Sequence, residues 1–374
     1  MQSLKLFSVS LLAIAFYGPE STAAATVYEI TNLGNVTLKA INNLGSIVGY
    51  DSNSGFLWKN GVFTPLVPTN VEDYPFHPND INDLDEIVGV RGSLSGEAAY
   101  RWTAGQFSAL QPSINTLTPY SQALKINNAG QIVGSYVMPA YVGGGVWRAT
   151  TWRETAISSD LQWQTLRGNY PSAQSVETYG IAQNNLGTVV GWSKAADSTF
   201  DVFTFSSNVM SALIVDGVDI HGVRPTDIND NGVIVGGDYF DRAFVLSSNG
   251  IRKLEFLGGT YSNALSVNDA GVVVGIATVN DGLQSGHAFV FDGEEMIDLS
   301  LLPSVQLAGW SELTRAIDIN NSGQIIGVGI LNGQQRSFLL TPVPEPSASV
   351  LFVLGLIGIF TALNFRARSD NLNV

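Results

Sequence analysis

The chain has 374 residues, a formal net charge of −14, no cysteine and only 13% charged residues. An acidic body repels phosphate backbones, which argues against nucleic acid as a partner. The lack of cysteine excludes disulfides, thiolate metal sites and cysteine nucleophiles. The 39 glycines, with frequent Val, Ile, Thr and aromatic residues, favour many short strands over helices.

Residues 1–25 have the features of a secretory signal peptide. Lys5 supplies one positive charge, residues 6–17 form a short apolar run, and three alanines end the segment. The run is too short to cross a bilayer. We therefore predict an exported protein, with cleavage after Ala25 and with Ala23 and Ala24 as alternative sites.

One hairpin motif occurs seven times, at intervals of 39 to 57 residues. The motif begins with an apolar residue (Gln183 in the fourth copy), followed by Asn, a second residue that is Asn or Asp, a variable residue and Gly. An apolar run that ends in Gly follows. The first Asn of the copies is Asn42, Asn82, Asn127, Asn184, Asn229, Asn268 and Asn320. Asn and Asp form turns through their own side chains, and Gly supplies a left-handed position. The second copy has Asp85 in place of this Gly, and we expect Asp85 to be left-handed.

A second shared segment follows most hairpins and consists of an aromatic strand, a Gly turn and another strand. It is clear at residues 55–66, 99–110, 243–254 and 287–298, and weak near Thr151 and Val202. The run Ile47–Val48 and its equivalents predict strands that are buried on both faces. Four short strands in about 45 residues suit one blade of a β-propeller. We therefore predict an all-β, seven-bladed propeller over residues 26–341.

The two ends of the repeat region complement each other. Residues 26–33 resemble the fourth strand of a unit, whereas the last unit ends near residue 341 after its third strand. We predict that the N-terminal strand completes the seventh blade, because a closed ring leaves no exposed sheet edge there.

The repeat also resembles a known family. Residues 257–275 and 286–298 are similar to the HAF repeat of bacterial extracellular proteins, whose His-Ala-Phe triplet stands here once, at His287, Ala288 and Phe289. This resemblance covers about residues 30–340. It implies an extracellular protein and brings no enzymatic activity with it.

Few residues suggest chemistry. The three histidines, His77, His221 and His287, lie in different repeats, and we find no nucleophile-elbow, HExxH or phosphate-loop motif. We therefore predict no catalytic residue and no cofactor, and we interpret His287 as structural. The alternative of a Ser-His-Asp set, whose residues would come together only in the folded protein, stays open.

One stretch matches the start of a calcium loop. Asp227, Asn229 and Asn231 precede Gly232, and Asp238 stands at the twelfth position. These residues also form the hairpin turn of the fifth copy, which explains them without an ion. We therefore predict no metal site and keep these four residues as the only candidate.

The longest insertion separates the third and fourth copies and is rich in aromatic residues. Trp147, Trp152, Trp163 and Tyr170 lie there, on a segment that departs from the repeat and is typical of a binding loop. They are candidates for a ligand platform that takes sugar rings or a partner chain. Local packing is the alternative explanation.

The C-terminus carries an apolar segment with a motif before it. Pro344, Glu345 and Pro346 precede the uncharged residues 348–365, and Arg366 and Arg368 follow. The segment predicts a transmembrane helix with its C-terminal end inside the cell. In this order the features resemble the PEP-CTERM sorting tail of Gram-negative bacteria and cyanobacteria. The resemblance implies that residues 342–374 are a sorting tail, that exosortase, a membrane protease, cleaves near the Pro-Glu-Pro motif, and that the protein moves to the surface. An ordinary single-span anchor is the alternative.

These observations favour an exported surface or extracellular-matrix protein that binds or scaffolds without catalysis. Its expected partners are exosortase, the membrane through the C-terminal helix, and exopolysaccharide. The alternative is a polysaccharide-active enzyme, or a lectin-like glycan binder. Paired carboxylates at one mouth of the central channel would favour the enzyme, whereas an apolar plug would count against it.

Overall fold

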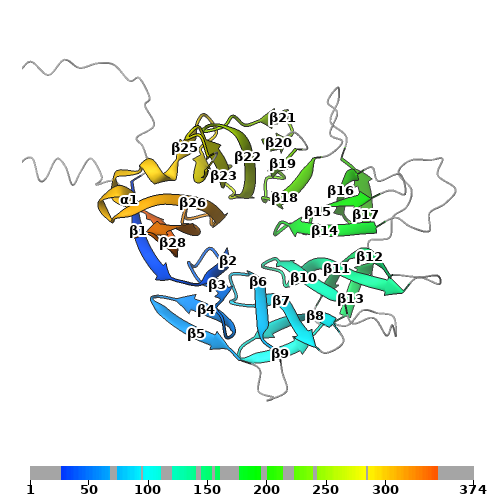
Figure 1. Ribbon diagram of the computed structural model, residues 1–374. Coiled ribbons are helices and arrows are strands. Elements are labelled where there is room, and N and C mark those ends of the chain that lie inside the picture. Colours follow the sequence, from blue (N-terminus) through cyan, green and yellow to red (C-terminus); the bar gives the residue numbers. More distant parts are fainter. Residues whose placement is uncertain are drawn as a thin grey trace, which may run out of the picture.

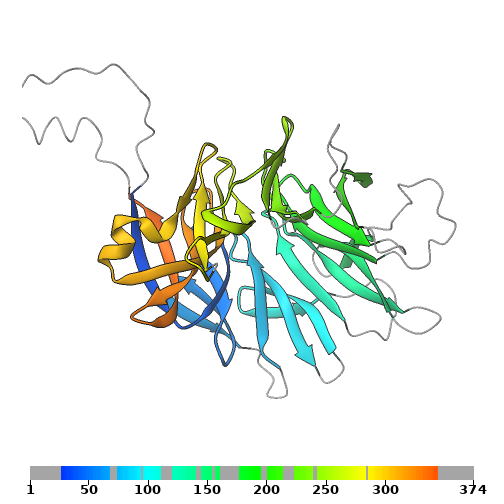
Figure 2. The same ribbon diagram turned by 45° about the horizontal axis from the view of Figure 1, so that its top comes forward.

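The computed structural model describes residues 27–343, apart from residues 68–73, 94–95, 111–119, 140–144, 154–155, 161–176, 195–199, 214–222, 239–241 and 284. In this part of the chain the strands form seven four-stranded antiparallel sheets. Figure 1 shows the sheets as blades around a central axis, and Figure 2 shows the same ring turned by 45°. The predicted all-β, seven-bladed propeller is confirmed.

Blades 1 to 6 each contain four consecutive strands, of which the first is innermost. Blade 1 is β2 (Thr37–Ile41), β3 (Ile47–Tyr50), β4 (Gly55–Lys59) and β5 (Val62–Leu66); blade 2 is β6 (Phe76–Ile81), β7 (Ile87–Ser93), β8 (Gly96–Thr103) and β9 (Gln106–Ala109). Blade 3 is β10 (Ser121–Ile126), β11 (Gln131–Pro139), β12 (Gly145–Arg153) and β13 (Ala156–Asp160); blade 4 is β14 (Glu177–Gln183), β15 (Val189–Lys194), β16 (Phe200–Ser206) and β17 (Val209–Ala212). Blade 5 is β18 (Arg224–Ile228), β19 (Ile234–Gly237), β20 (Ala243–Ser247) and β21 (Gly250–Lys253); blade 6 is β22 (Gly258–Val267), β23 (Val273–Val279), β24 (Gly286–Phe291) and β25 (Met296–Asp298).

Blade 7 is completed by the N-terminal strand. Its own strands are β26 (Trp310–Ile319), β27 (Ile325–Leu331) and β28 (Gln334–Pro342), and β1 (Tyr28–Gly34) pairs with β28 as the fourth. A 3₁₀ turn, η2 (Leu299–Leu301), and a short helix, α1 (Pro303–Leu307), connect blades 6 and 7. The predicted closure by the N-terminal strand is confirmed.

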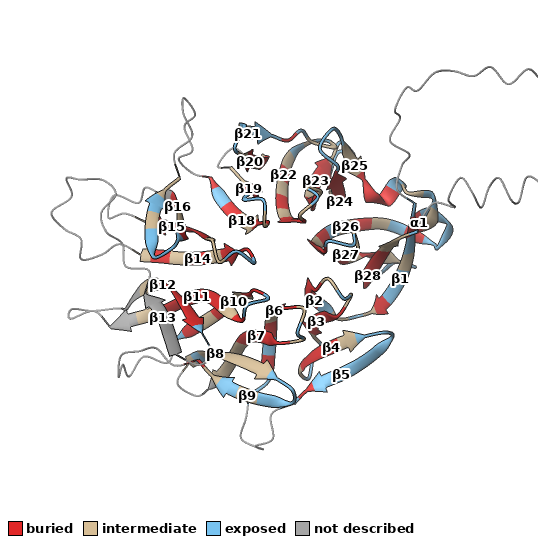
Figure 3. Ribbon diagram, turned by 180° about the vertical axis from the view of Figure 1, so that it is seen from behind, coloured by how far each residue is buried: buried red, intermediate tan, exposed pale blue. Residues whose placement is uncertain are grey.

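The hydrophobic core lies between neighbouring blades, and the second strand of each blade serves two interfaces. Ile47 packs in a cluster with Ile326 of blade 7, whereas Val48 packs with Ile81 of blade 2. Both side chains are fully buried, as the continuous apolar run predicts. Figure 3 shows burial along the inner strands and exposure on outer strands such as β5 and β9.

The Gly that ends each apolar run is required by the neighbouring strands. Each innermost strand has a β-bulge just before its paired end, as between Leu38 and Ala40. Beside the bulge, a backbone carbonyl of the innermost strand lies so close that a Cβ would overlap it at Gly49, Gly89, Gly134, Gly191, Gly236, Gly275 and Gly327. In five blades a Phe ring of the third strand fills the space on this Gly, as Phe289 does at Gly275. Only a residue without a side chain fits there.

The predicted signal peptide and the predicted sorting tail lie outside the described residues. This holds for the signal peptide with Ala25 and for the sorting residues Pro344, Glu345, Pro346, Arg366 and Arg368. The expected transmembrane segment, residues 348–365, also lies outside. Among the residues that are described, no helix has the length and apolarity to cross a membrane.

Candidate functional site at the hairpin mouth of the channel

The seven hairpin turns surround one end of the central channel, which we call the hairpin mouth. In the first copy Asn42 accepts hydrogen bonds at Oδ1 from the backbone N–H groups of Leu44 and Ser46, at 3.1 and 2.8 Å. Gly45 is left-handed, with φ +77°, and Asp85 adopts the same conformation with φ 56°. The turn chemistry predicted from the sequence is therefore confirmed.

The same Asn side chains connect the blades in a closed ring. Each Nδ2 donates to the backbone carbonyl of the equivalent Asn in the next blade, at 2.8 to 3.2 Å. The last bond runs from Asn320 in blade 7 to Asn42 in blade 1, at 2.9 Å. We call this set the first Asn ring. It consists of Asn42, Asn82, Asn127, Asn184, Asn229, Asn268 and Asn320.

The residue after each of these Asn residues forms a second ring. Its Oδ1 accepts the backbone N–H of the equivalent residue in the preceding blade, at 2.7 to 2.9 Å. We call this set the second ring. It consists of Asn43, Asp83, Asn128, Asn185, Asp230, Asp269 and Asn321.

The two rings explain a difference in residue type that turn chemistry alone does not. The first position must donate and accept, so it is Asn in every copy. The second position needs an acceptor toward the preceding blade, so Asp serves as well as Asn. These hydrogen bonds between blades were not predicted from the sequence. The available signal was a first position that is always Asn, followed by a second position that is Asn or Asp.

Three carboxylates line the channel just inside the rings. Asp80, Asp227 and Asp318 stand two positions before a ring Asn, and each accepts a backbone N–H of the next blade at 2.7 to 3.0 Å. Lys125 occupies the equivalent position in blade 3, with Nζ 3.6 Å from Asp80 Oδ1. These side chains border a cavity of about 140 Å³, enough for a few water molecules or a small polar ligand. The described residues that line this part of the channel are mostly polar.

Burial raises the pKa of Asp80 to about 6, although Lys125 opposes the shift. Burial also raises the pKa of Asp227. The pKa of Lys125 is raised because the three carboxylates, Asp80 foremost, outweigh the cost of burying its charge. With one ammonium facing three carboxyl groups, protonation of a carboxyl group relieves the excess negative charge.

Asp227 and Asp318 share one hydroxyl group. Ser266 Oγ lies 3.0 Å from Asp227 Oδ2 and 2.6 Å from Asp318 Oδ1. A hydroxyl has a single proton to donate. Ser266 therefore donates to one carboxyl group at a time and bridges the two side chains.

The candidate calcium residues have separate partners. Asp227 points into the channel, and Asn229 belongs to the first Asn ring. Asn231 donates to the Asp269 carbonyl, and Asp238 accepts from the backbone of Arg242 and pairs with Lys253 at 2.8 Å. Among the described residues no group of three or more Asp, Glu or His side chains is arranged to hold a metal ion.

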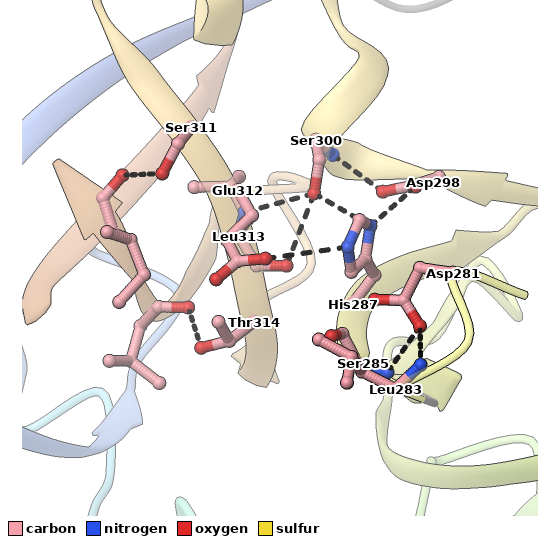
Figure 4. A network of polar contacts seen from close by, with 12 residues as sticks. Asp281, Leu283, Ser285, His287, Asp298, Ser300, Ser311, Glu312, Leu313 and Thr314 are labelled. Carbon is pink, nitrogen blue, oxygen red and sulfur yellow. Dashed lines mark hydrogen bonds and ion pairs between the residues drawn. The ribbon is translucent and has the colours of Figure 1, made fainter. Parts of the chain in front are cut away.

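His287 sits in a polar network between blades 6 and 7 (Figure 4). Its Nδ1 is 2.8 Å from Asp298 Oδ2 and 3.3 Å from Ser300 Oγ, and its Nε2 is 3.7 Å from Glu312 Oε2. A catalytic triad needs Ser and Asp on opposite ring nitrogens, whereas both contact Nδ1 here. Ser300 Oγ also accepts the Leu313 N–H at 3.0 Å, so this network joins the blades.

The remaining histidines and the aromatic candidates are dispersed. His77 is exposed and stacks on Tyr50, with ring centroids 4.7 Å apart, and His221 lies outside the described residues. Trp152 is fully buried in the core between blades 2 and 3. Trp163 and Tyr170 are also outside the described residues.

Trp147 belongs to an aromatic stack that the sequence did not reveal. Its ring is 6.0 Å from Tyr179, and Tyr179 is 4.2 Å from Trp192. All three rings are half-buried. Tyr179 and Trp192 lie in regular strands of blade 4, so their alignment with Trp147 was not visible without the blade arrangement.

Comparison with known proteins supports the fold alone. No family model matches the chain, and no curated protein matches its sequence. The solved structure of YCF48 bound to D1 peptide is 10% identical, with a TM-score of 0.51, and the match covers 86% of this chain and 96% of that one. PorZ of Porphyromonas gingivalis is 11% identical with a TM-score of 0.45, covering 84% of this chain and 39% of PorZ. Trypanosoma rangeli sialidase in complex with the inhibitor DANA is 10% identical with a TM-score of 0.34, and the match covers 87% of this chain and 57% of the sialidase.

Proposed function

We propose that this propeller is an exported, non-catalytic binding or scaffold protein of the cell surface or extracellular matrix. The observation that carries the proposal is the use of the repeated polar residues. In both rings these side chains hold neighbouring blades together, at 2.7 to 3.2 Å. The repeat therefore builds a rigid closed disc, which suits a scaffold that presents its variable segments.

The proposed location at the surface is supported by the resemblance of the two ends of the sequence to known export and sorting signals. A signal peptide that ends at Ala25 and a PEP-CTERM tail imply export followed by exosortase processing. Cleavage near Pro344 to Pro346 would release the propeller from the transmembrane segment 348–365.

Processing is tested by changing Pro344, Glu345 and Pro346 together to alanine in a host that has exosortase. We expect the variant to stay in the membrane fraction with its tail attached, while the unchanged chain appears at the surface or in the matrix without it. A matched control replaces Ser347 with Ala. Normal release of the triple variant would refute exosortase processing and leave an ordinary anchor.

The scaffold role has its own test. The host is compared with a strain that lacks this chain, and the extracellular matrix is extracted and weighed. We expect the chain to co-purify with the matrix and the matrix to weaken without it. A chain that is released freely into the medium, with an unaltered matrix, would contradict the role.

One observation favours a second function, cleavage of polysaccharide. The channel holds two carboxyl groups whose pKa values are raised by burial, that of Asp80 to about 6, and Ser266 bridges Asp227 to Asp318. Such groups can act as acid and base in glycoside hydrolysis. However, each carboxylate also holds a backbone N–H of the next blade. Sugar release from a polysaccharide panel, abolished by Asp318→Asn, would support the enzyme, and no release would exclude it for that panel.

A further inference from the structure

The end of the channel away from the hairpins has a chemistry of its own. We call it the opposite mouth and define it by the residues five positions before the first Asn ring. Blades 2 to 7 have His77, Gln122, Tyr179, Arg224, Asn263 and Arg315 there. Each pairs with the residue that follows the buried Gly of the second strand, as Tyr179 does with Trp192. At about 3.3 Å per residue these positions lie about 15 Å along the strands from the rings.

Aromatic rings gather at two places on the opposite mouth. Between blades 3 and 4, Trp147, Tyr179 and Trp192 form the half-buried stack. Between blades 1 and 2, His77 stacks on Tyr50, and Lys39 Nζ lies 5.8 Å from the Tyr50 ring centroid. Half-buried aromatic rings offer flat apolar surface to solvent, which is the surface that the C–H face of a sugar ring covers.

The opposite mouth carries charges of both signs. Arg224 and Arg315 stand at the defining positions and are exposed, whereas Glu177 is hydrogen-bonded to Tyr179 beside the aromatic stack. Among the described residues Arg315 has no ion-pair partner. The hairpin mouth, in contrast, has six aspartates, namely Asp80, Asp83, Asp227, Asp230, Asp269 and Asp318. Arg315 therefore offers an anion an exposed cationic contact, whereas the six aspartates of the hairpin mouth repel an anion.

We propose that the opposite mouth binds an acidic polysaccharide, with sugar rings on the aromatic residues and a carboxylate group paired with Arg315. Arginine suits this task because its planar guanidinium forms two parallel hydrogen bonds to a carboxylate. Gln122 and Asn263 add amide groups that pair with sugar hydroxyls. The inference rests on the proposed binding function and names its ligand class.

The test measures binding of the full chain to polygalacturonate, to neutral dextran and to polyglutamate by affinity electrophoresis. We expect polygalacturonate to bind, dextran to bind at least tenfold more weakly, and polyglutamate to bind weakly because it offers charge without sugar rings. Raising the salt concentration from 0.05 to 0.5 M should weaken binding, since the ion pairs are exposed. Equal binding of dextran would overturn the acidic class, and equal binding of polyglutamate would overturn the sugar.

Two variants locate the site. Arg315→Ala should weaken polygalacturonate binding about tenfold, and Trp192→Ala should weaken it at least as much. The matched controls are Arg252→Ala, on the outer strand β21, and Leu186→Ala, on a hairpin turn. Unchanged binding by both mouth variants, or equal loss in the controls, would overturn the site.

The outcomes separate this inference from the proposed function. A chain that co-purifies with the matrix but binds no polygalacturonate keeps its scaffold role and loses this ligand. A chain that binds polygalacturonate but is absent from the matrix keeps the site and loses the role. Thermal unfolding of each variant shows whether lost binding reflects lost folding.

Discussion

The two mouths of the channel are built from the same seven strands and differ in how their side chains are used. At the hairpin mouth every copy repeats the same contacts, and the Asn and Asp groups bond the next blade. At the opposite mouth the equivalent position changes from Tyr179 to Arg224 to Asn263. Regularity therefore marks the end that holds the ring together, whereas the side chains of the opposite end differ from blade to blade.

The largest expected effect breaks the first Asn ring. Asn229→Asp keeps the acceptor for its own turn but replaces the donor that bonds the Asn268 carbonyl at 2.8 Å with a buried negative charge. We expect it to lower the free energy of unfolding by about 4 kcal/mol, measured by urea denaturation. The neighbouring Asp230→Asn keeps its acceptor for Asn185, and we expect a cost below about 1 kcal/mol. Equal costs would refute the distinction between the two rings.

A second effect of the hairpin mouth depends on pH. Folding raises the pKa of Asp80 from about 3.9 to about 6, so the protonated form favours the folded state. This contribution is fully present below pH 4 and is lost as the pH rises through 6, a change of about 3 kcal/mol. Asp80→Asn should therefore gain stability relative to the unchanged chain between pH 4 and pH 7. A difference that stays constant across this range would contradict the shift.

The opposite mouth should contribute less to folding. Trp192→Ala removes a half-buried ring that stacks on Tyr179 at 4.2 Å, and we expect a cost of about 2 kcal/mol. The measurement is again urea denaturation, with Trp152→Ala as the comparison because Trp152 is fully buried and should cost about 4 kcal/mol. A larger cost for Trp192 would make the stack structural and weaken its role as a ligand surface.

The smallest expected effect belongs to Arg315. It is exposed and has no ion-pair partner among the described residues, so Arg315→Ala should change the free energy of unfolding by less than about 0.5 kcal/mol. Thermal unfolding beside the unchanged chain measures this. A clear loss of stability would show that Arg315 serves the fold.

Short segments of the sequence were sufficient to predict the turn conformation and the closure of the last blade. Asp85 was expected in the left-handed position of the second turn and has φ 56°. The N-terminal strand was expected to complete the last blade and pairs with β28. In both cases the partners or conformation follow from a pattern that the repeat shows in its other copies.

Contacts between blades could not be predicted in this way. The four aromatic candidates came from one insertion, yet Trp152 is buried in the core and Trp147 stacks on Tyr179 of the next blade. The candidate calcium residues are close in sequence, yet the bulge of β18 turns Asp227 into the channel, away from Asp238. Proximity along a strand does not place side chains on the same side of a blade.

By itself the sequence determined the turns, the number of blades and the closure of the ring, because each depends on a short pattern that is repeated or completed along the chain. Only the tertiary structure decided what the Asn, Asp and Gly residues contact across blades. The partner of Asn320 is Asn42, at the other end of the chain, and the two meet only when the ring closes. The different chemistry of the two mouths likewise arises when seven equivalent strands surround one axis.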